Sequence, residues 1–393
     1  MKKLAFFKGE LLYWIIQKTI QENRGEEQRK TFLSVKIIFK ENWERYKGLY
    51  NTREVEKTEV EKMLSCKGME RGCFVYYCKN CNREVIVPFG CNSRICSCCG
   101  KRHADRWADK LANKIEGGIT YRHLTFSIPS VLWPYVKENR MLMKIMMDIA
   151  YKTSQRIFSS SVNNHITPGI IAVLHPFIGD LSFSPHVHCI ATEGGFSDDG
   201  KFIPLKPYVN YSSFHLKWQY DILSAFRKYI PKEVIDLCFR QYPKGFCAYL
   251  KPEKIRAGKG LICYIGRYIR HPSIANSRIV AYNGEAVKFI YKDKEEKEVF
   301  KIMLVDDFIS AIISHIPERN FKMIRYYGIY SRKRMRNTRE RFKQLSITQK
   351  LLFKPTENKI FICPYCYEKM EFIMYCKKPP PKSKNNLDYW ISA

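Results

Sequence analysis

The cysteines of this chain are unevenly placed, because eight of the fifteen lie between Cys66 and Cys99. Within this stretch, Cys78-Lys-Asn-Cys81 and Cys96-Ser-Cys-Cys99 form two Cys-x-x-Cys pairs separated by 14 residues. Two turns that each offer two thiolates suit the tetrahedral coordination of zinc. Four protein ligands close such a site, so the ion would stabilise the chain and perform no chemistry. The clustering predicts a structural zinc module.

The charge of the chain indicates the kind of partner it binds. Lys and Arg number 68 against 38 Asp and Glu, which gives a formal net charge of +30. The basic residues are spread along the sequence, and nucleic acid is the commonest polyanion that such a chain meets. A membrane surface is the alternative, but no apolar run approaches the roughly 18–20 residues of a spanning helix. We therefore expect a soluble, cytoplasmic protein that binds DNA and no membrane.

A second zinc ion could be bound by the remaining ligands of the cysteine-rich stretch, which are Cys66, Cys73, Cys91 and His103. Two alternatives stay open. Cys98 could replace a ligand of the first site, and His103 could be a surface residue beside DNA. Near the C-terminus, Cys363-Pro-Tyr-Cys366 is half of a ribbon, either with Cys376 as a third ligand or without metal. We expect one or two structural Zn²⁺ ions in all.

Two histidines, His186 and His188, flank one apolar residue in a β-rich run that ends at Gly194-Gly195. Side chains at positions i and i+2 of a strand project to the same face. The two imidazoles can therefore bind one divalent ion while Val187 faces the opposite layer. Histidines in a strand are more often satisfied core residues, but the double glycine indicates that the backbone here approaches something closely.

A useful cation site needs a third ligand. The preceding run, 169–177, forms a predicted hairpin with 182–192, so its His175 could reach the ion as a cross-strand neighbour. Asp180 in the turn and His123 on the first strand are alternatives. Two or three imidazoles with open positions would suit Mg²⁺ or Mn²⁺ that takes further oxygens from a phosphate.

Tyr264 and Tyr268 lie four residues apart, on one face of a predicted helix. Tyrosines at this spacing often only pack a core, but Arg267 and Arg270 on the same segment could hold phosphate oxygens. A tyrosine oxygen that attacks phosphorus gives a 5′-phosphotyrosine and a free 3′-OH, and the reverse reaction rejoins the strand. The metal centre and the tyrosines together suggest breakage and rejoining of single-stranded DNA.

The order of the predicted elements indicates an α+β fold. Strands are expected at 119–128, 169–177, 182–192, 246–250, 277–283 and 287–291, and helices at 141–158, 212–228, 233–239, 305–316 and 334–346. This order predicts an antiparallel sheet with flanking helices over about residues 119–310.

Several stretches together resemble the HUH-type, double-tyrosine transposases of the insertion-sequence-91 family. They are the cysteine pairs of the zinc module, Arg-His-Leu-Thr-Phe-Ser-Ile-Pro at 122–129, the histidine region 170–190, the tyrosine region 264–279 and the segment 315–331. Together they cover about residues 60–335. Serine and cysteine stand at Ser97-Cys98, where the family pattern has a proline and a variable residue.

The resemblance implies an endonuclease domain with a central antiparallel sheet, the histidine pair on its central strand and the tyrosine helix packed opposite. It implies that Tyr264 and Tyr268 are the nucleophiles of a transposase that moves an insertion sequence through single-stranded, rolling-circle-like intermediates. The protein could also associate with further copies of itself on the DNA ends of the element.

With this resemblance the chain divides into a helical region 1–63, a zinc-binding domain 64–116, an HUH domain 117–310, a basic helical region 311–376 and a disordered tail 377–393. The segment Arg325–Lys343 carries eight basic side chains against one acid, with aromatic residues between them. This composition suits a single strand, so Arg325, Arg332 and Arg334 are expected to contact DNA, although a solvated helical face is the simpler explanation.

Two other functions fit the same residues. A rolling-circle replication initiator or relaxase would use the same nicking chemistry. A zinc-ribbon protein without catalysis would bind DNA and would not depend on His186 or His188.

Overall fold

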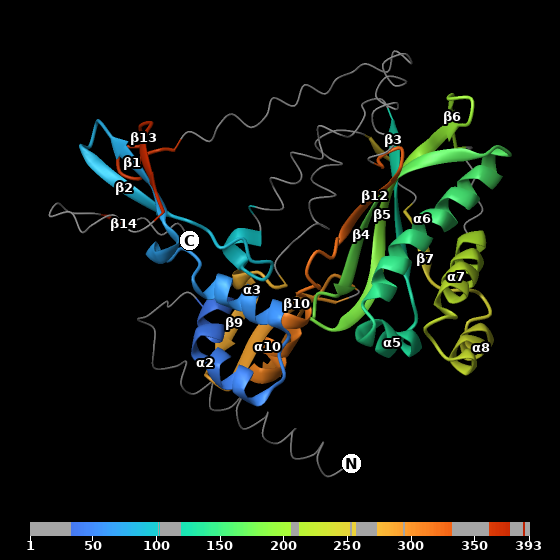
Figure 1. The fold of residues 1–393 in the computed structure, drawn as a ribbon, viewed down its shortest axis with the longest axis horizontal. Coiled ribbons are helices and arrows are strands. Elements are labelled where there is room, and N and C mark those ends of the chain that lie inside the picture. Colours follow the sequence, from blue (N-terminus) through green and yellow to red (C-terminus); the bar gives the residue numbers. More distant parts are fainter. Residues whose placement is uncertain are drawn as a thin grey trace, which may run out of the picture.

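The computed structural model describes residues 33–100, 102, 119–205, 212–251, 254–256, 273–293, 295–331, 361–377 and 388–389. These residues form three separate sheets of seven, three and four strands, together with the helices that cover them. Figure 1 shows the four-stranded and seven-stranded sheets at opposite ends, with the three-stranded sheet and its helices between them. The described part of the chain thus consists of three packed bodies.

The seven-stranded sheet is antiparallel, with the order β12-β4-β5-β3-β7 and with β6 and β8 on its margins. Its strands are β3 (Thr120–Ser127), β4 (Ile166–Phe177), β5 (Phe183–Ser197), β6 (Phe202–Pro204), β7 (Ala248–Leu250), β8 (Ile255–Arg256) and β12 (Ile324–Gly328). The hairpin expected from 169–177 and 182–192 is confirmed as β4 and β5, the central pair. Strand β5 alternates buried residues with half-buried histidines at its start, which is the pattern of a strand with two different faces.

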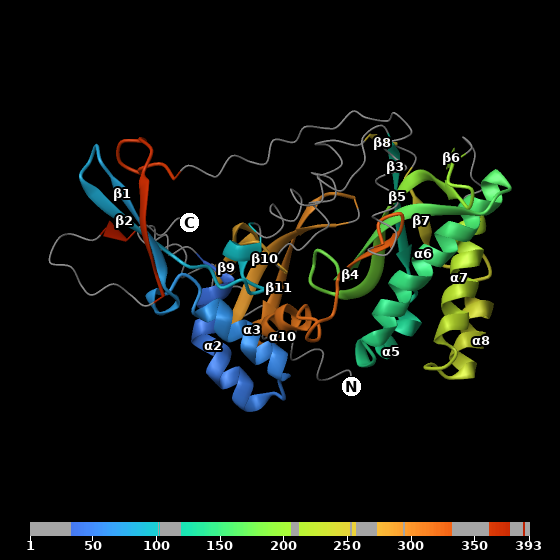
Figure 2. The same cartoon turned by 45° about the horizontal axis from the view of Figure 1, so that its top comes forward.

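One face of this sheet is covered by helices (Figure 2). They are α5 (Trp133–Glu138), α6 (Met141–Val162), α7 (Ser212–Phe226) and α8 (Lys232–Gln241). Val187, Leu174 and Phe126 project from the strands into a buried cluster with Met146 and Trp218 from the helices. The largest apolar cluster lies here, so the strands present this face to the core, while a smaller apolar cluster that includes Tyr121, Ile171 and Ile190 lies on the opposite face.

The double glycine of β5 allows close approach to neighbouring strands. A Cβ atom on Gly195 would lie 2.7 Å from the Thr167 carbonyl on β4, and one on Gly194 would lie 2.5 Å from the Ile203 carbonyl on β6. Gly194 also has a φ of +150°. The close approach expected from the sequence is therefore made by the protein's own backbone.

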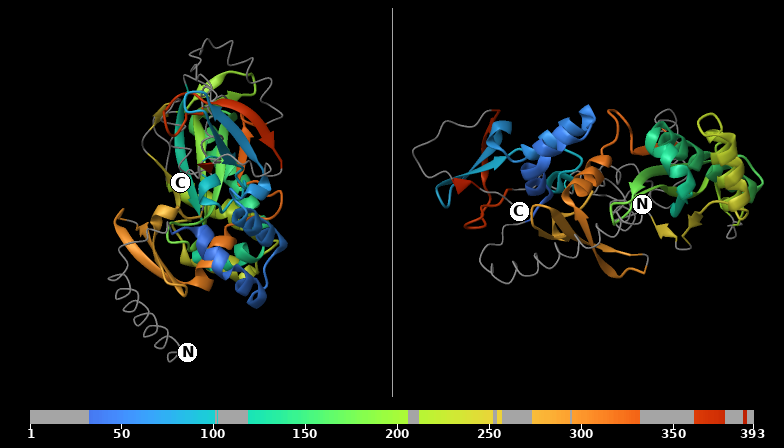
Figure 3. Two further views of the ribbon diagram at one scale, coloured as in Figure 1. Left: turned by 90° about the vertical axis from the view of Figure 1, so that its left-hand side faces the viewer. Right: turned by 90° about the horizontal axis from the view of Figure 1, so that it is seen from below.

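The second body combines segments from distant parts of the sequence. Helices α2 (Val35–Leu49) and α3 (Glu54–Leu64) lie with the sheet of β9 (Ile279–Tyr282), β10 (Ala286–Lys292) and β11 (Glu298–Leu304), and with α10 (Val305–Ser314). The apolar stripe of α10, with Phe308 and Ile312, is buried in the same cluster as Trp43 and Phe289. Residues 274–316, most of which were expected in one domain over 117–310, thus pack with the N-terminal helices. Figure 3 shows this body from below, between the other two.

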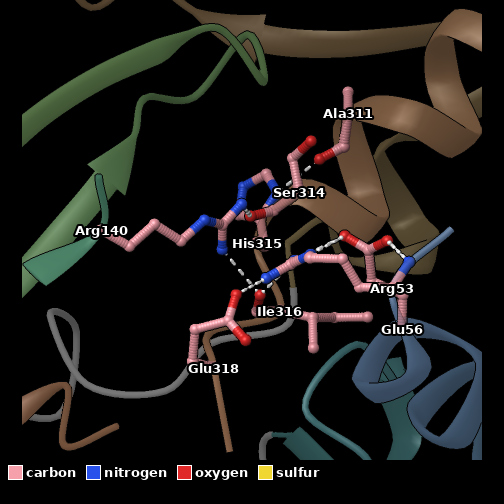
Figure 4. Close-up of polar contacts among 8 residues, drawn as sticks. All are labelled: Arg53, Glu56, Arg140, Ala311, Ser314, His315, Ile316 and Glu318. Carbon is pink, nitrogen blue, oxygen red and sulfur yellow. Dashed lines mark hydrogen bonds and ion pairs between the residues drawn. The ribbon is translucent and has the colours of Figure 1, made fainter. Parts of the chain in front are cut away.

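Arg140 joins the helices of the seven-stranded sheet, hereafter the main sheet, to the second body, at a carbonyl that Arg53 also contacts (Figure 4). Arg140, just before α6, and Arg53, just before α3, each donate to the carbonyl oxygen of Ile316 at 2.8 Å. Arg140 also donates to the Ser314 carbonyl at 3.2 Å, and Arg53 pairs with Glu318. Cations at the carboxyl end of α10 compensate the negative end of the helix dipole.

The four-stranded sheet combines strands from the N-terminal and the C-terminal parts of the described chain. It has the order β13-β1-β2-β14, with strands β1 (Cys73–Cys78), β2 (Arg83–Pro88), β13 (Glu371–Cys376) and β14 (Asp388–Tyr389). Short 3-10 helices lie at Met69–Arg71, Ser130–Leu132 and Asn276–Arg278.

The structure differs from two expectations for the C-terminal part of the chain. The region 311–376 was expected to be basic and helical, but its described residues supply β12 to the main sheet and β13 to the four-stranded sheet. The tail 377–393 was expected to be disordered, but Asp388–Tyr389 pairs in parallel with β2. The helix expected at 334–346 lies outside the described residues. Within the part of the chain that is described, no helix has the length and apolar character to cross a membrane.

Candidate metal centres

Three histidines meet on the face of the main sheet opposite its helices. His186 and His188 alternate with Val187, which is fully buried on the helix side. His175 on β4 is the direct cross-strand partner of His186. Ring nitrogens of the three residues all lie within 4.8 Å of one another, and the three side chains are half-buried. This is the geometry that a shared cation requires.

Hydrogen bonds fix which nitrogen of two of these rings faces the centre. His186 Nδ1 lies 2.7 Å from the carbonyl oxygen of Ser184, so Nδ1 carries the proton and donates it. His188 Nδ1 lies 2.9 Å from His123 Nε2 and 3.2 Å from Thr125 Oγ1. Both histidines are therefore left with Nε2 as the ligand atom.

His123 and Asp180, the alternatives for a third ligand, are engaged in other hydrogen bonds. His123 stands behind His188 as a hydrogen-bond partner and is not in the group of three. Asp180, in the β4–β5 turn, accepts from Ser182 and Lys301. His175 is the histidine that the register brings to the pair, in the position expected from the sequence, and its role as a ligand stays a proposal.

Burial favours the neutral form of His186, His188 and His123. It lowers the pKa of His186 and, together with the neighbouring charges, lowers that of His188 further. The pKa of His123 falls to about 4, mainly through burial. Neutral imidazole is the form that binds metal, so the lowered pKa values of His186 and His188 favour metal binding.

A positively charged side chain, that of Lys251, lies beside the histidines. The register pairs Leu124 with Leu250, and the Lys251 N–H donates to the His123 carbonyl at 2.9 Å. Paired residues share a face, so Lys251 projects on the histidine side, and its charge lowers the pKa of His188. No motif in the sequence singles out Lys251, because its place depends on the pairing of a short edge strand.

The other candidate residues for DNA chemistry are placed differently. Tyr264, Tyr268, Arg267, Arg270, Arg332 and Arg334 lie outside the described residues. Arg325 is on β12, paired with Ala172 of the helix-covered face, and its guanidinium lies 3.9 Å from Asp148. Strand pairing turns Arg325 toward α6, and its expected contact with DNA stays a prediction.

A first cluster of four thiols lies at the base of the β1–β2 hairpin. It consists of Cys66, Cys91, Cys96 and Cys99, all buried. The sulfur of Cys66 lies 3.7 Å from that of Cys99 and 3.6 Å from that of Cys96. The backbone N–H of Ser93 donates to the Cys91 sulfur at 3.4 Å. Four thiolates at these separations fit one tetrahedral Zn²⁺.

The expected grouping of cysteines is wrong. Cys78 and Cys81 do not join Cys96 and Cys99 but form a second cluster with Cys363 and Cys366. Strands β1 and β2 have six residues each, which places the knuckle at the hairpin tip roughly 20 Å from the base. Cys73, expected in a second site, instead faces Cys376 across β1 and β13. His103 lies outside the described residues.

Comparisons with protein families agree with this architecture. Residues 38–128 match a family described as "Transposase zinc-binding domain", and residues 169–339 match one described as "Putative transposase". The first match contains six of the eight clustered thiols, and the second contains the three histidines of the sheet. The protein is a transposase, an enzyme class that cleaves DNA and transfers its strands.

Two relatives extend over most of the chain. The "Transposase for insertion sequence element IS801" of Pseudomonas savastanoi pv. phaseolicola is 27% identical over 299 residues, 70% of each chain. The "Putative transposase y4qJ" of Sinorhizobium fredii is 26% identical over 325 residues, 74% of this chain and 78% of its own. No solved structure matches. The chain belongs to the insertion-sequence-91 family of transposases, with an N-terminal zinc-binding domain, as the sequence indicated.

Proposed function

We propose that this transposase nicks and rejoins single-stranded DNA at the three-histidine centre, by the chemistry of HUH-type enzymes. The observation that carries the proposal is the convergence of His175, His186 and His188 on the sheet face opposite α5, α6, α7 and α8. Three imidazole ligands leave open coordination positions, which a catalytic ion needs and a structural ion does not. Bound Mg²⁺ or Mn²⁺ would polarise a scissile phosphate there.

The residues of this chain would act in the following way. His186 and His188, held by Ser184 and His123, would each offer Nε2 to the ion. Lys251 adds a positive charge for a phosphate oxygen. Tyr264 or Tyr268 supplies the phenol oxygen that attacks phosphorus.

The covalent step exchanges one phosphodiester bond for another. A bond forms between the tyrosine oxygen and phosphorus, and the bond from phosphorus to the 3′-oxygen breaks. The phenol proton passes to solvent, and the departing 3′-oxygen takes up a proton as the 3′-OH. The reverse reaction rejoins a strand, so that two tyrosines could hold two ends during rolling-circle-like transposition of an insertion sequence. Self-association on the DNA ends is part of this proposal.

The test uses single-stranded oligonucleotides from the termini of the element, with Mn²⁺ or with chelator. The parent protein should form an SDS-resistant adduct only with metal. Tyr264→Phe/Tyr268→Phe and His186→Ala/His188→Ala should form none, while both retain DNA affinity. An adduct of normal yield from the double tyrosine variant would refute the proposal. If DNA is bound but the parent forms no adduct under any condition, a DNA-binding protein without catalysis becomes the better description.

A further inference from the structure

The second thiol cluster combines two cysteines from the N-terminal part of the chain with two from its C-terminal part. Cys78 and Cys81 come from the tip of the β1–β2 hairpin, and Cys363 and Cys366 lie more than 280 residues further on. The sulfurs of Cys78 and Cys366 are 3.5 Å apart, and those of Cys81 and Cys363 are 3.9 Å apart. The C-terminal pair lies beyond both matched family segments, which end at residues 128 and 339.

The two knuckles have the same local conformation. Each is a Cys-x-x-Cys turn enclosed by antiparallel backbone pairing, which is the β1–β2 ladder for the first and a single bridge, Ile362–Lys369, for the second. In each, the residue after the second cysteine has a left-handed backbone, with φ of +51° at Asn82 and +61° at Tyr367. Such a φ is unusual for tyrosine. The same left-handed φ at the equivalent position of both turns indicates that the two turns serve the same function.

Aromatic side chains from both segments pack beside the cluster. Tyr76 of β1 stacks on Phe361, with ring centroids 4.4 Å apart, and Phe74 contacts Phe372 and Tyr375 of β13. Phe372 and Tyr375 nevertheless remain 56% and 52% exposed. A six-residue strand that buries so little of its largest side chains gains limited hydrophobic stabilisation from its place on β1.

We propose that a second Zn²⁺ binds Cys78, Cys81, Cys363 and Cys366 and fastens the C-terminal segment 361–377 to the zinc-binding domain. This ion is separate from the one at Cys66, and each knuckle alone supplies only half of its ligands. Metal binding then provides the free energy that holds β13 in the four-stranded sheet. The site makes the C-terminal segment a structural part of the N-terminal zinc-binding domain.

Metal analysis of the purified full-length protein tests the ligand set. The parent should contain two Zn²⁺ per chain, and Cys363→Ser/Cys366→Ser should contain one. Cys376→Ser is the matched control, because Cys376 belongs to the same segment but to neither thiol group, and this variant should keep two. One Zn²⁺ in the parent, or two in the double variant, would overturn the proposal.

Hydrogen exchange measured by mass spectrometry tests the fastening. In Cys363→Ser/Cys366→Ser, amides of 371–376 should exchange at least tenfold faster than in Cys376→Ser, while those of β4 and β5 should stay protected. Unchanged protection of 371–376 would contradict the role of the ion. If the double variant loses both ions, mild chelation of the parent decides: release of one Zn²⁺ with selective exposure of 371–376 supports the proposal, and uniform exposure refutes it. Neither readout depends on DNA cleavage, so failure of the nicking proposal would leave the result unaffected.

Discussion

The hydrogen bond between His123 and His188 gives a quantitative prediction for metal binding. His123 Nε2 lies 2.9 Å from His188 Nδ1, and the two rings stack with centroids 5.0 Å apart. His123→Phe keeps a stacked ring but removes the nitrogen that lies against His188 Nδ1. Loss of such an outer partner typically costs 10–100-fold in metal affinity. Because Thr125 Oγ1 still lies 3.2 Å from the same nitrogen, we expect the lower limit, about tenfold or about 1.4 kcal/mol.

The assay is a Mn²⁺ titration of the purified protein by calorimetry, repeated as half-saturation of oligonucleotide nicking. His123→Phe/Thr125→Val removes both acceptors and should weaken Mn²⁺ binding about 100-fold. His165→Phe is the control, because His165 is an exposed histidine that pairs with Asp198 away from the centre. Equal Mn²⁺ affinity in the parent and in the double variant would refute this account of how His188 is oriented.

Three further predictions concern charged groups. Burial raises the pKa of the Glu193 carboxyl, but hydrogen bonds from Thr120, Lys254 and Arg122 outweigh it and lower the pKa overall. This carboxylate therefore stabilises the fold above about pH 4.5, and the contribution is lost as pH falls through the depressed folded pKa. Glu193→Gln should weaken the acid dependence of urea unfolding. Arg140→Met should lower the free energy of unfolding by about 2 kcal/mol, since the charged hydrogen bond to Ile316 is lost, and denaturant titration measures it. Lys251→Ala should slow nicking about tenfold or more while Lys251→Arg retains most of the rate, and equal rates would contradict its place at the phosphate.

Local sequence patterns predicted the central part of the fold. The alternation around Val187 defined a strand with two faces, and the short connection at Gly179-Asp180 defined the hairpin, so the cross-strand position of His175 followed from register alone. The apolar spacing of 141–158 and 305–316 likewise predicted helices that the structure contains as α6 and α10. These features depend on neighbours in sequence, and such neighbours carry the signal of period 2 or 3.6.

The features that the sequence did not predict depend on distant partners. Two Cys-x-x-Cys pairs 14 residues apart could share an ion, and only the length of the β1–β2 hairpin keeps them apart. The pairing of Cys78 with Cys366 has no local signal at all. The sequence around Arg325 indicates only a basic stretch, because no neighbouring residue indicates that 324–328 pairs with β4.

The most direct test of the central claim is the identity of the residue that becomes linked to DNA. The protein is incubated with a single-stranded terminal oligonucleotide and Mn²⁺, digested, and the nucleotide-bearing peptide is sequenced by mass spectrometry. We predict a phosphodiester on Tyr264 or Tyr268, absent in chelator and absent from His186→Ala/His188→Ala. A linkage to any other residue, or equal yield without metal, would contradict the proposed role of the histidine centre.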